Sequence, residues 1–298
     1  MTWPLLALTG AIAQAAYSTG VKAVLPRVSP CFLAGSSFLV ASGALFSLSF
    51  LAGFPPLSPG FFPAAAVTVG INLAATLLLY RALSLSDLSL CMPMLSFTPV
   101  FLIATSALIL GEIPDPAGIL GIFLVAAGSF LLAARAGSSG FCAPLGRLFG
   151  DPGIRLMLVV AFLYSISVNY DKIAVETSDP LFSSAVVFFS LGLLMLAAAC
   201  IGYIGWKMPP WRSSGTSTAH RPVMILLPAL GLVLALEAIS INLAYTLSIV
   251  PYVISVKRLS TFFAVLFGGC LLHEGNLRSR AAGSLVMIAG TVLIALYG

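Results

Sequence analysis

Charged side chains are the scarcest feature of this sequence. Asp, Glu, Lys and Arg make up 8% of the 298 residues, and there are only two histidines. A soluble domain carries charge on roughly a quarter of its residues. A chain this poor in charge cannot cover the surface of a water-soluble domain of its length, so we exclude that class of protein.

Motifs of enzymes and of ATP-driven pumps are also missing. The sequence contains no Walker loop, no HExxH zinc motif and no GxSxG nucleophile elbow. Neither His220 nor His273 lies deep in an apolar run, so no general base is expected inside a membrane. The five cysteines lack the spacing of a metal site and are interpreted as small buried apolar side chains. We therefore expect no enzyme, no metal site and no cofactor.

What the sequence has instead is a series of long apolar runs. Hydrophobic residues make up 60% of the chain, and the mean hydropathy is +1.10. A helix of about 20 apolar residues spans a bilayer, and prolines in the gaps separate one run from the next. The ten predicted spans are 3–23, 31–52, 61–83, 88–110, 117–135, 153–175, 181–203, 222–247, 250–272 and 279–297. The predicted fold class is an all-α membrane protein of ten transmembrane helices.

The few charges lie mostly in the short gaps between these runs. The formal net charge is +5, and its expected partner is the anionic inner leaflet of the lipid bilayer, not nucleic acid. One side of the predicted topology holds Lys172 alone. The other side holds eleven of the 14 Lys and Arg, namely Lys22, Arg27, Arg81, Arg135, Arg147, Arg155, Lys207, Arg212, Arg221, Arg278 and Arg280. Basic residues in short loops stay cytoplasmic, so both termini are predicted outside, in a bacterial inner membrane.

The chain also repeats itself. Residues 80–132 align without a gap on residues 242–294, and the alignment sets Glu112 on Glu274. It also pairs Gly121 with Gly283 and Gly128 with Gly290. The predicted domains are a first repeat over 1–135, a linker over 136–152 and a second repeat over 153–298. Because each repeat has five spans, an odd number, the second should lie upside down relative to the first, as an inverted repeat.

A proline, a Gly-Glu pair and two spaced glycines resemble the EamA repeat of the drug/metabolite transporter superfamily. They are Pro99, Gly111, Glu112, Gly121 and Gly128, and the second half matches them with Glu274, Gly283 and Gly290. The resemblance covers nearly the whole chain and implies a ten-helix secondary carrier with a central cavity between its halves. Members of the superfamily include amino-acid and metabolite exporters and, more distantly, triose-phosphate and nucleotide-sugar translocators.

Two adjacent cations, Lys257 and Arg258, lie near the middle of the ninth predicted span. A cation at the centre of a bilayer costs on the order of 3 kcal/mol, and Glu237 is the one carboxylate equally deep in the second half. Adjacent helical residues point about 100° apart, so we expect one cation to pair with Glu237 and the other to face a cavity. The alternative is a closed network that only holds the two spans together. The two cations also resemble the basic pair on the ninth helix of phosphate translocators, although Leu95-Ser96 stand at this position in the first half.

Other polar side chains at membrane depth complete the predicted substrate site. They are Asn242 and Tyr245 in the eighth span, Asn72 and Tyr80 in the third, Gln14 and Tyr17 in the first, and Asn169 and Tyr170 in the sixth. Together they fit the polar, partly aromatic wall of a cavity. Each of them alone is also explained by a hydrogen bond between two helices.

Three further features are expected to be structural. Glu112 and Glu274 should lie at the N-terminal ends of the fifth and tenth spans, where the helix dipole favours a carboxylate. The glycines of these two spans should let each pack closely against a neighbour. Pro93 and Pro99 predict a kink in the fourth span. The second half has no proline at either position, so the two halves need not bend alike.

The predicted function is secondary-active export or exchange of a small polar metabolite such as an amino acid, by alternating access around the central cavity. A coupling ion or a counter-substrate would accompany the substrate, and the chain would act as a monomer or a homodimer. An alternative is an exchanger of organic anions or phosphorylated metabolites that uses Lys257 and Arg258. A protein of a different class, an intramembrane scaffold subunit without transport, would not need these buried charges.

Overall fold

The structure is a computed structural model that describes residues 2–24, 28–86, 88–134, 150–201, 220–271 and 277–297. All regular secondary structure within these ranges is helical. The expectations for His273 and Glu274, and most of the predicted linker, lie outside the described residues.

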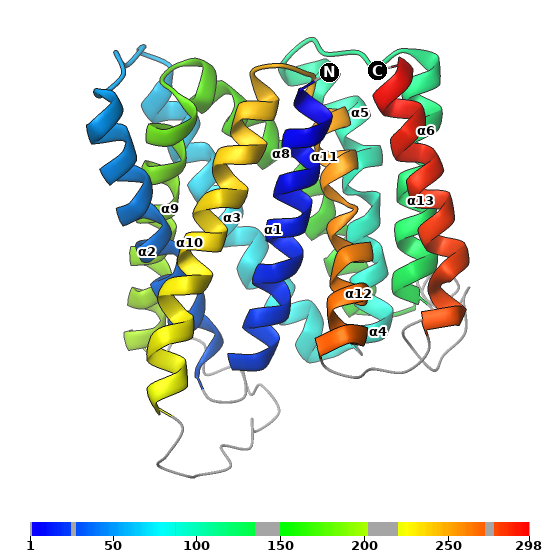
Figure 1. Ribbon diagram of the computed structural model, residues 1–298, viewed down its shortest axis with the longest axis horizontal. Coiled ribbons are helices and arrows are strands. Elements are labelled where there is room, and N and C mark those ends of the chain that lie inside the picture. Colours follow the sequence, from blue (N-terminus) through cyan, green and yellow to red (C-terminus); the bar gives the residue numbers. More distant parts are fainter. Residues whose placement is uncertain are drawn as a thin grey trace.

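The helices match the predicted spans to within a few residues at each end. Those of the first half are α1 (Trp3–Val24), α2 (Pro30–Ala52), α3 (Phe61–Leu85), α4 (Leu88–Cys91), the 3-10 helix η2 (Met92–Phe97), α5 (Thr98–Ile109) and α6 (Pro116–Ala134). Those of the second half are α8 (Pro152–Glu176), α9 (Pro180–Ile201), α10 (His220–Tyr245), α11 (Val250–Lys257), α12 (Ser260–Leu271) and α13 (Leu277–Tyr297). Both termini lie at the same end of the bundle, at the top of Figure 1, which we call the terminal face.

Most of these elements have the length and apolarity of membrane spans. Among the described residues, seven helical segments are long and apolar enough to cross a membrane, and two shorter apolar segments cover 116–132 and 282–297. The predicted all-α membrane fold is confirmed.

Proline sets the beginnings of several helices. α2, α6, α8 and α9 start at Pro30, Pro116, Pro152 and Pro180. A proline in the first turn loses no hydrogen bond, because the amides of that turn have no partner within the helix. The Asp151 carboxylate caps α8 by accepting hydrogen bonds from the amides of Gly153, at 2.9 Å, and Ile154, at 3.3 Å.

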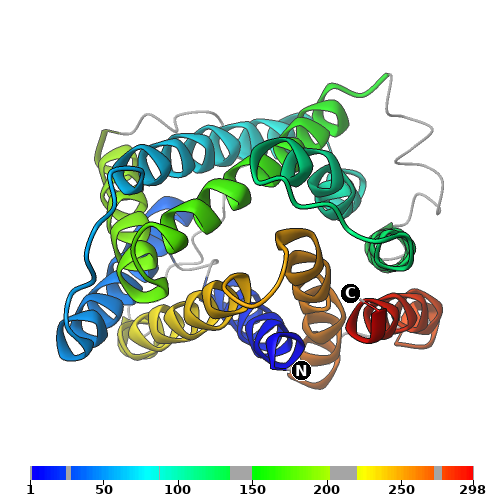
Figure 2. The same ribbon diagram turned by 90° about the horizontal axis from the view of Figure 1, so that it is seen from above.

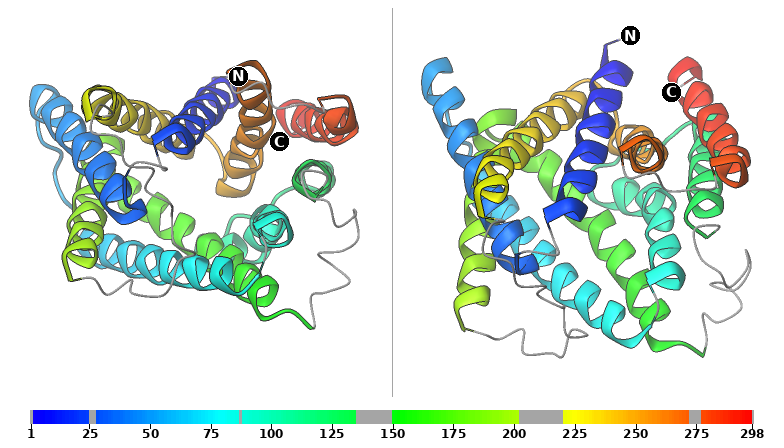
Figure 3. Two further views of the ribbon diagram at one scale, coloured as in Figure 1. Left: turned by 90° about the horizontal axis from the view of Figure 1, so that it is seen from below. Right: turned by 60° about the horizontal axis from the view of Figure 1, so that its bottom comes forward.

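The helices form two layers joined at both edges (Figures 2 and 3). α3 and α8 pack together in one layer, and α1 and α10 pack together in the other. These two pairs become equivalent when the halves of the chain are exchanged. α2 packs on α9 at one edge and α6 packs on α13 at the other, so each edge joins a helix to its own counterpart. α6 and α13 run in opposite directions (Figure 1), which agrees with the predicted inverted repeat.

Glycines bring α6 and α13 into backbone contact. A Cβ atom on Gly128 would lie 2.7 Å from the carbonyl oxygen of Gly283, and one on Gly290 would lie 2.7 Å from that of Gly121. Atoms cannot approach so closely, so only glycine fits. The prediction that these glycines allow close packing is confirmed.

The opposite edge is built in the same way. A Cβ atom on Gly35 of α2 would lie 3.1 Å from the carbonyl oxygen of Gly192 of α9, and the reverse distance is also 3.1 Å. We call these two contact lines, α6–α13 and α2–α9, the glycine seams. Each seam joins the two halves of the chain.

The fourth and ninth spans are both interrupted near their middle. In the first half, η2 separates α4 from α5, and Pro93 lies in its first turn. In the second half, Arg258 and Leu259 separate α11 from α12, and the amide of Leu259 donates to the carbonyl of Val256 at 3.0 Å. The halves therefore bend alike, although the sequence indicated a bend only in the first. The Ser255 hydroxyl donates to its own helix at 2.6 Å, a bond that bends helices where no proline is present.

Candidate functional site

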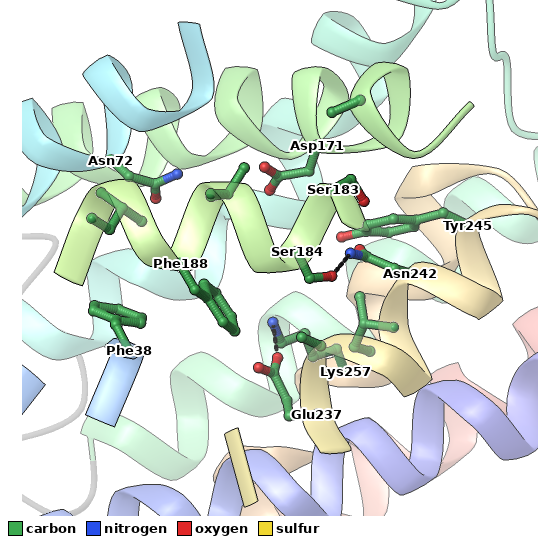
Figure 4. A pocket seen from close by; sticks show the side chains of 15 residues that line it. Phe38, Asn72, Asp171, Ser183, Ser184, Phe188, Glu237, Asn242, Tyr245 and Lys257 are labelled. Carbon is green, nitrogen blue, oxygen red and sulfur yellow. Dashed lines mark hydrogen bonds and ion pairs between the residues drawn. The ribbon is translucent and has the colours of Figure 1, made fainter. Parts of the chain in front are cut away.

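A cavity of about 170 Å³ lies between the two layers (Figure 4). One water molecule needs about 10–15 Å³ on this measure, so the cavity has room for a small metabolite. Its lining includes the side chains of Phe38, Asn72, Asp171, Ser183, Ser184, Phe188, Glu237, Asn242, Tyr245 and Lys257. They come from both halves of the chain, and the set mixes polar, charged and aromatic groups.

An ion pair between Lys257 and Glu237 lies in this cavity (Figure 4). Glu237 is 5% exposed, and the Lys257 side chain is 29% exposed. Lys257 is the last residue of α11, where the negative end of the helix dipole favours a cation. The interruption of the ninth span therefore places the Lys257 ammonium group, and the predicted pair is formed by Lys257.

Arg258 follows at the break between α11 and α12. It is absent from the cavity lining, and its guanidinium interacts electrostatically with the Tyr164 phenol of α8. Within the described ranges its guanidinium forms no ion pair. The structure differs here from the expectation that one cation pairs and the other faces the cavity, because Lys257 does both.

Asp171 faces the cavity from α8 and is held by α3. Thr68 Oγ1 donates a hydrogen bond to Asp171 Oδ1 at 2.5 Å. Asn72 Nδ2 donates to Ser167 Oγ at 2.6 Å and to the Thr68 carbonyl at 2.9 Å. These bonds join α3 to α8 and use both amide hydrogens of Asn72.

The opposite wall comes from α9 and α10. Asn242 Nδ2 donates to Ser184 Oγ at 2.6 Å (Figure 4). The rings of Phe38 and Phe188 lie with their centroids 5.2 Å apart, and Tyr245 is 3% exposed. The cavity thus has aromatic groups beside polar ones.

A second ion pair closes the terminal face. Lys172 Nζ pairs with Glu112 Oε1 and donates to the Ser248 carbonyl at 3.1 Å. Glu112 Oε2 accepts a hydrogen bond from the Val250 amide at 2.8 Å. Lys172 is 8% exposed. We call this group the terminal clamp, because it joins the α5–α6 loop to α8 and to the α10–α11 loop.

The terminal clamp corrects two expectations from the sequence. Lys172 lies at the end of the sixth predicted span and was counted as a charge on the outer side, but it is buried within α8, 8% exposed. Glu112 was expected at the N-terminus of its own next helix, but it lies at the first residue of α11, in the other half. A sequence pattern shows only neighbours along the chain, and this partner is far away in it.

A tyrosine supports the clamp. Tyr252 Oη donates to Asp115 Oδ2 and accepts from the Asp115 amide, both at 3.1 Å. Its ring also stacks on Trp3 of α1, with centroids 6.3 Å apart. The first half and the second half therefore meet at several polar contacts on the terminal face.

Comparisons with known proteins indicate a family for the first half. The model of the EamA-like transporter family matches residues 1–134. The first half of the chain is thus similar to the EamA-like transporter family. The predicted resemblance to the drug/metabolite transporter superfamily is thereby confirmed, and the apolar helices support a multi-pass membrane protein.

A solved structure has a similar fold over the whole length of the chain. A protein whose title reads only "Crystal structure of protein" superposes with a TM-score of 0.79 at 14% sequence identity, covering 100% of this chain and 99% of the other. At this identity the likeness concerns the fold alone. No curated protein sequence matches the chain.

The structure brings together five of the predicted site residues. Asn72, Glu237, Asn242, Tyr245 and Lys257 line the cavity. The predicted residues that lie outside its lining are Arg258, Tyr80, Gln14, Tyr17, Asn169 and Tyr170. The site is therefore concentrated on α3, α8, α9, α10 and α11.

Several of the other predicted residues have structural contacts. Asn169 accepts a hydrogen bond from Ser106 at 2.6 Å and donates to Thr105 at 3.2 Å, so it joins α8 to α5. Tyr170 packs against an apolar cluster around Phe61. These contacts correspond to the alternative interpretation, in which a polar residue in a span bonds two helices.

Asp171 and the serine pair of α9 were missed by the sequence reasoning. The sequence places Asp171 beside Asn169 and Tyr170 in the last third of the sixth span, but only the latter two were included in the predicted site. α8 extends to Glu176, which places Asp171 more than one turn inside the helix. In the sequence, Ser183 and Ser184 are two hydroxyl side chains near the start of a span, and nothing in the pattern indicates that they line a cavity.

Proposed function

We propose that this chain is a secondary-active carrier that moves a small polar metabolite such as an amino acid by alternating access. The observation that supports the proposal most is the polar cavity between the two layers, where an interrupted helix places Lys257. In carriers built from repeats, substrate sites occur near the midplane at the repeat interface and use interrupted helices. The cavity of this chain is lined by residues of both halves, and Lys257 enters it from the end of an interrupted helix, which supports the proposal.

A scaffold subunit without transport explains these features less well. A scaffold has no use for a cavity with room for a small solute, nor for a carboxylate that lies in it without a cationic partner. Intramembrane charged residues generally serve function, because they are costly to keep in an apolar environment. We therefore favour a carrier over a scaffold.

The anion-exchange alternative receives less support than the amino-acid alternative. A phosphate-type site would place Lys257 and Arg258 together against the substrate. Here Arg258 lies outside the cavity lining, and the Lys257 charge is matched by Glu237. An organic anion would have to displace Glu237 to gain a full ionic contact.

Alternating access requires a gate on each side of the cavity. We propose the terminal clamp as the gate on the terminal face, because it joins the two halves there. In this proposal the terminal face is the outer side of a bacterial inner membrane. The described basic residues Lys22, Arg81 and Arg155 are exposed near helix ends opposite the terminal face, as the rule for cytoplasmic loops requires.

Solute exchange in liposomes that contain only this protein tests the proposal. Vesicles loaded with an unlabelled amino-acid mixture should take up labelled amino acids faster than protein-free vesicles, and the uptake should saturate. Labelled sugars of similar size serve as the control for leakage. Uptake that equals that of empty vesicles for all amino acids and organic acids would sink the carrier proposal and favour a scaffold.

A further inference from the structure

The central cavity contains one carboxylate that its neighbours do not neutralise. The ionisable acidic and basic side chains of the described lining are Asp171, Glu237 and Lys257. Glu237 and Lys257 neutralise each other. The neighbour that binds Asp171 is the neutral hydroxyl of Thr68, at 2.5 Å. In the part of the chain that the structure describes, no cation lies within ion-pair distance of Asp171.

Two carboxylates, Asp171 and Glu237, thus share the cavity lining with the one lining cation among the described residues, Lys257, and this excess of negative charge favours a cationic ligand. Charges interact more strongly in a protein interior than in water, since the effective dielectric constant is lower. A carboxylate without a counter-charge at membrane depth is costly, and it becomes stable when a cation enters beside it. The electrostatic balance of the cavity is therefore completed by one positive charge.

The neutral polar groups of the cavity point to the same ligand. Asn72 and Asn242 each donate an amide hydrogen to a serine hydroxyl, of Ser167 and Ser184 respectively. Their carbonyl oxygens remain as acceptors. A primary ammonium group has three N–H donors and no acceptor, so it complements a wall of oxygen acceptors beside a carboxylate.

The aromatic side chains favour a cation as well. Phe38, Phe188 and Tyr245 belong to the same lining, and the negative face of an aromatic ring attracts ammonium groups. The same faces repel anions. The one cation of the cavity, Lys257, is already bound to Glu237, so little remains to attract a carboxylate alone.

We propose that Asp171, positioned by Thr68, binds the protonated amino group of the transported solute, and that the carrier accepts small primary ammonium compounds, amino acids among them, over organic anions. This inference rests on the proposed function, because it names the substrate class of the same cavity. The Asp171 carboxylate and the Thr68 hydroxyl that define the ammonium site come from α8 and α3. The aromatic residues of the cavity lining, Phe38, Phe188 and Tyr245, come from α2, α9 and α10.

Two matched series of solutes test the assignment on the purified full-length protein. The first contains serine, its amine ethanolamine and its acid 3-hydroxypropionate. The second contains leucine, 3-methylbutylamine and 4-methylpentanoate. We expect the amine-bearing members of at least one series to raise the melting temperature in a saturable way, and we expect the corresponding acid to have no effect.

Variants of one carboxylate sharpen the test. Asp171→Asn keeps the size of the side chain and the acceptor for Thr68, and it should weaken amine binding roughly 10- to 100-fold, the range for a lost ionic hydrogen bond. Asp171→Glu keeps the charge and should retain measurable binding, which guards against a folding defect in Asp171→Asn. Glu176→Gln is the matched control, because Glu176 is an exposed carboxylate on the same helix, and its amine affinity should equal that of the wild type.

Three results would overturn the assignment: the acids bind best, no amine of either series binds, or Asp171→Asn binds amines as the wild type does. Liposome exchange separates this failure from failure of the carrier proposal. Exchange of amine-free acids would leave the carrier standing and remove the ammonium site. Amine binding that depends on Asp171, without any flux, would keep the site and remove the carrier function.

Discussion

Two Lys–Glu ion pairs of this molecule connect different parts of it. Glu237 and Lys257 lie on α10 and α11, so both belong to the second half of the chain. Glu112 belongs to the first half and Lys172 to the second. Both pairs are largely buried, but one lies within a single half and the other joins the two halves.

In the proposed mechanism, this difference separates a permanent contact from a gate. If the halves rock against each other, Glu237 and Lys257 move together and their distance is kept. Glu112 and Lys172 lie on opposite sides of the moving boundary, so their contact must break when the terminal face opens. The same chemistry therefore has two roles, and the place of each partner in the repeat decides which role it has.

The largest expected effect comes from breaking the pair within one half. Glu237→Gln leaves the Lys257 ammonium group in the cavity without its counter-charge, and removal of one partner of a buried pair typically costs about 3 kcal/mol or more. We expect the free energy of unfolding in detergent to fall by about 3 kcal/mol, measured by denaturant titration. The double variant with Glu237→Gln and Lys257→Gln should recover most of this loss. Equal stability of Glu237→Gln and wild type would contradict a permanent role for the pair.

A smaller effect, on conformation, should follow from breaking the terminal clamp. Glu112→Gln removes the charge that holds Lys172 and should shift the equilibrium toward opening at the terminal face by about 1–2 kcal/mol, or roughly 5- to 30-fold in population. The readout is the labelling rate of a cysteine placed at Ser183 in a cysteine-free background, with a membrane-impermeant maleimide added on the terminal side. Labelling should become faster.

Glu176→Gln provides the control for the clamp. Glu176 lies 3.8 Å from Lys172, but its side chain is 53% exposed, and an exposed pair contributes little. The labelling rate should stay unchanged in this variant. If Glu112→Gln and wild type label at the same rate, the ion pair is a fixed contact like the pair in the cavity, and the comparison between the two pairs fails.

The smallest effect is expected from a topology experiment, which reports on which side of the membrane the terminal clamp lies. A fusion to the C-terminus leaves both ion pairs intact. We expect a green fluorescent protein fusion to be dark and an alkaline phosphatase fusion to be active, because the basic loops hold the opposite face in the cytoplasm. A bright fluorescent fusion would place the clamp on the cytoplasmic side and reverse the proposed direction of the gate.

The fold could be predicted because bilayer physics makes each span a local property. An apolar run of about 20 residues predicts a helix whatever surrounds it, and the positions of the prolines mark the gaps. The glycine spacing in α6 and α13 also gave the correct packing role, since small residues at helical spacing allow close approach. The bend at Arg258 was missed because no proline marks it.

The site could be predicted only in part because it depends on contacts between distant segments. Lys257 and Glu237 were found as rare charges in apolar runs. The sequence could not show that the side-chain amide of Asn169 forms hydrogen bonds with α5. Nor could it show that Asp171, two residues later on α8, lines the cavity. It also could not show that Lys172 meets Glu112, because that contact depends on how the two halves are folded against each other.

The two glycine seams have a mechanical consequence. At each edge glycines bring the backbones of the two halves into close approach, and these points fix the distance between the paired helices. A relative movement of the halves would then reduce to a rotation about the line that joins the seams. This line would be the rotation axis, and the cavity and the terminal clamp lie between the two glycine seams. A small turn about it would widen one mouth of the cavity by the same angle as it narrows the other.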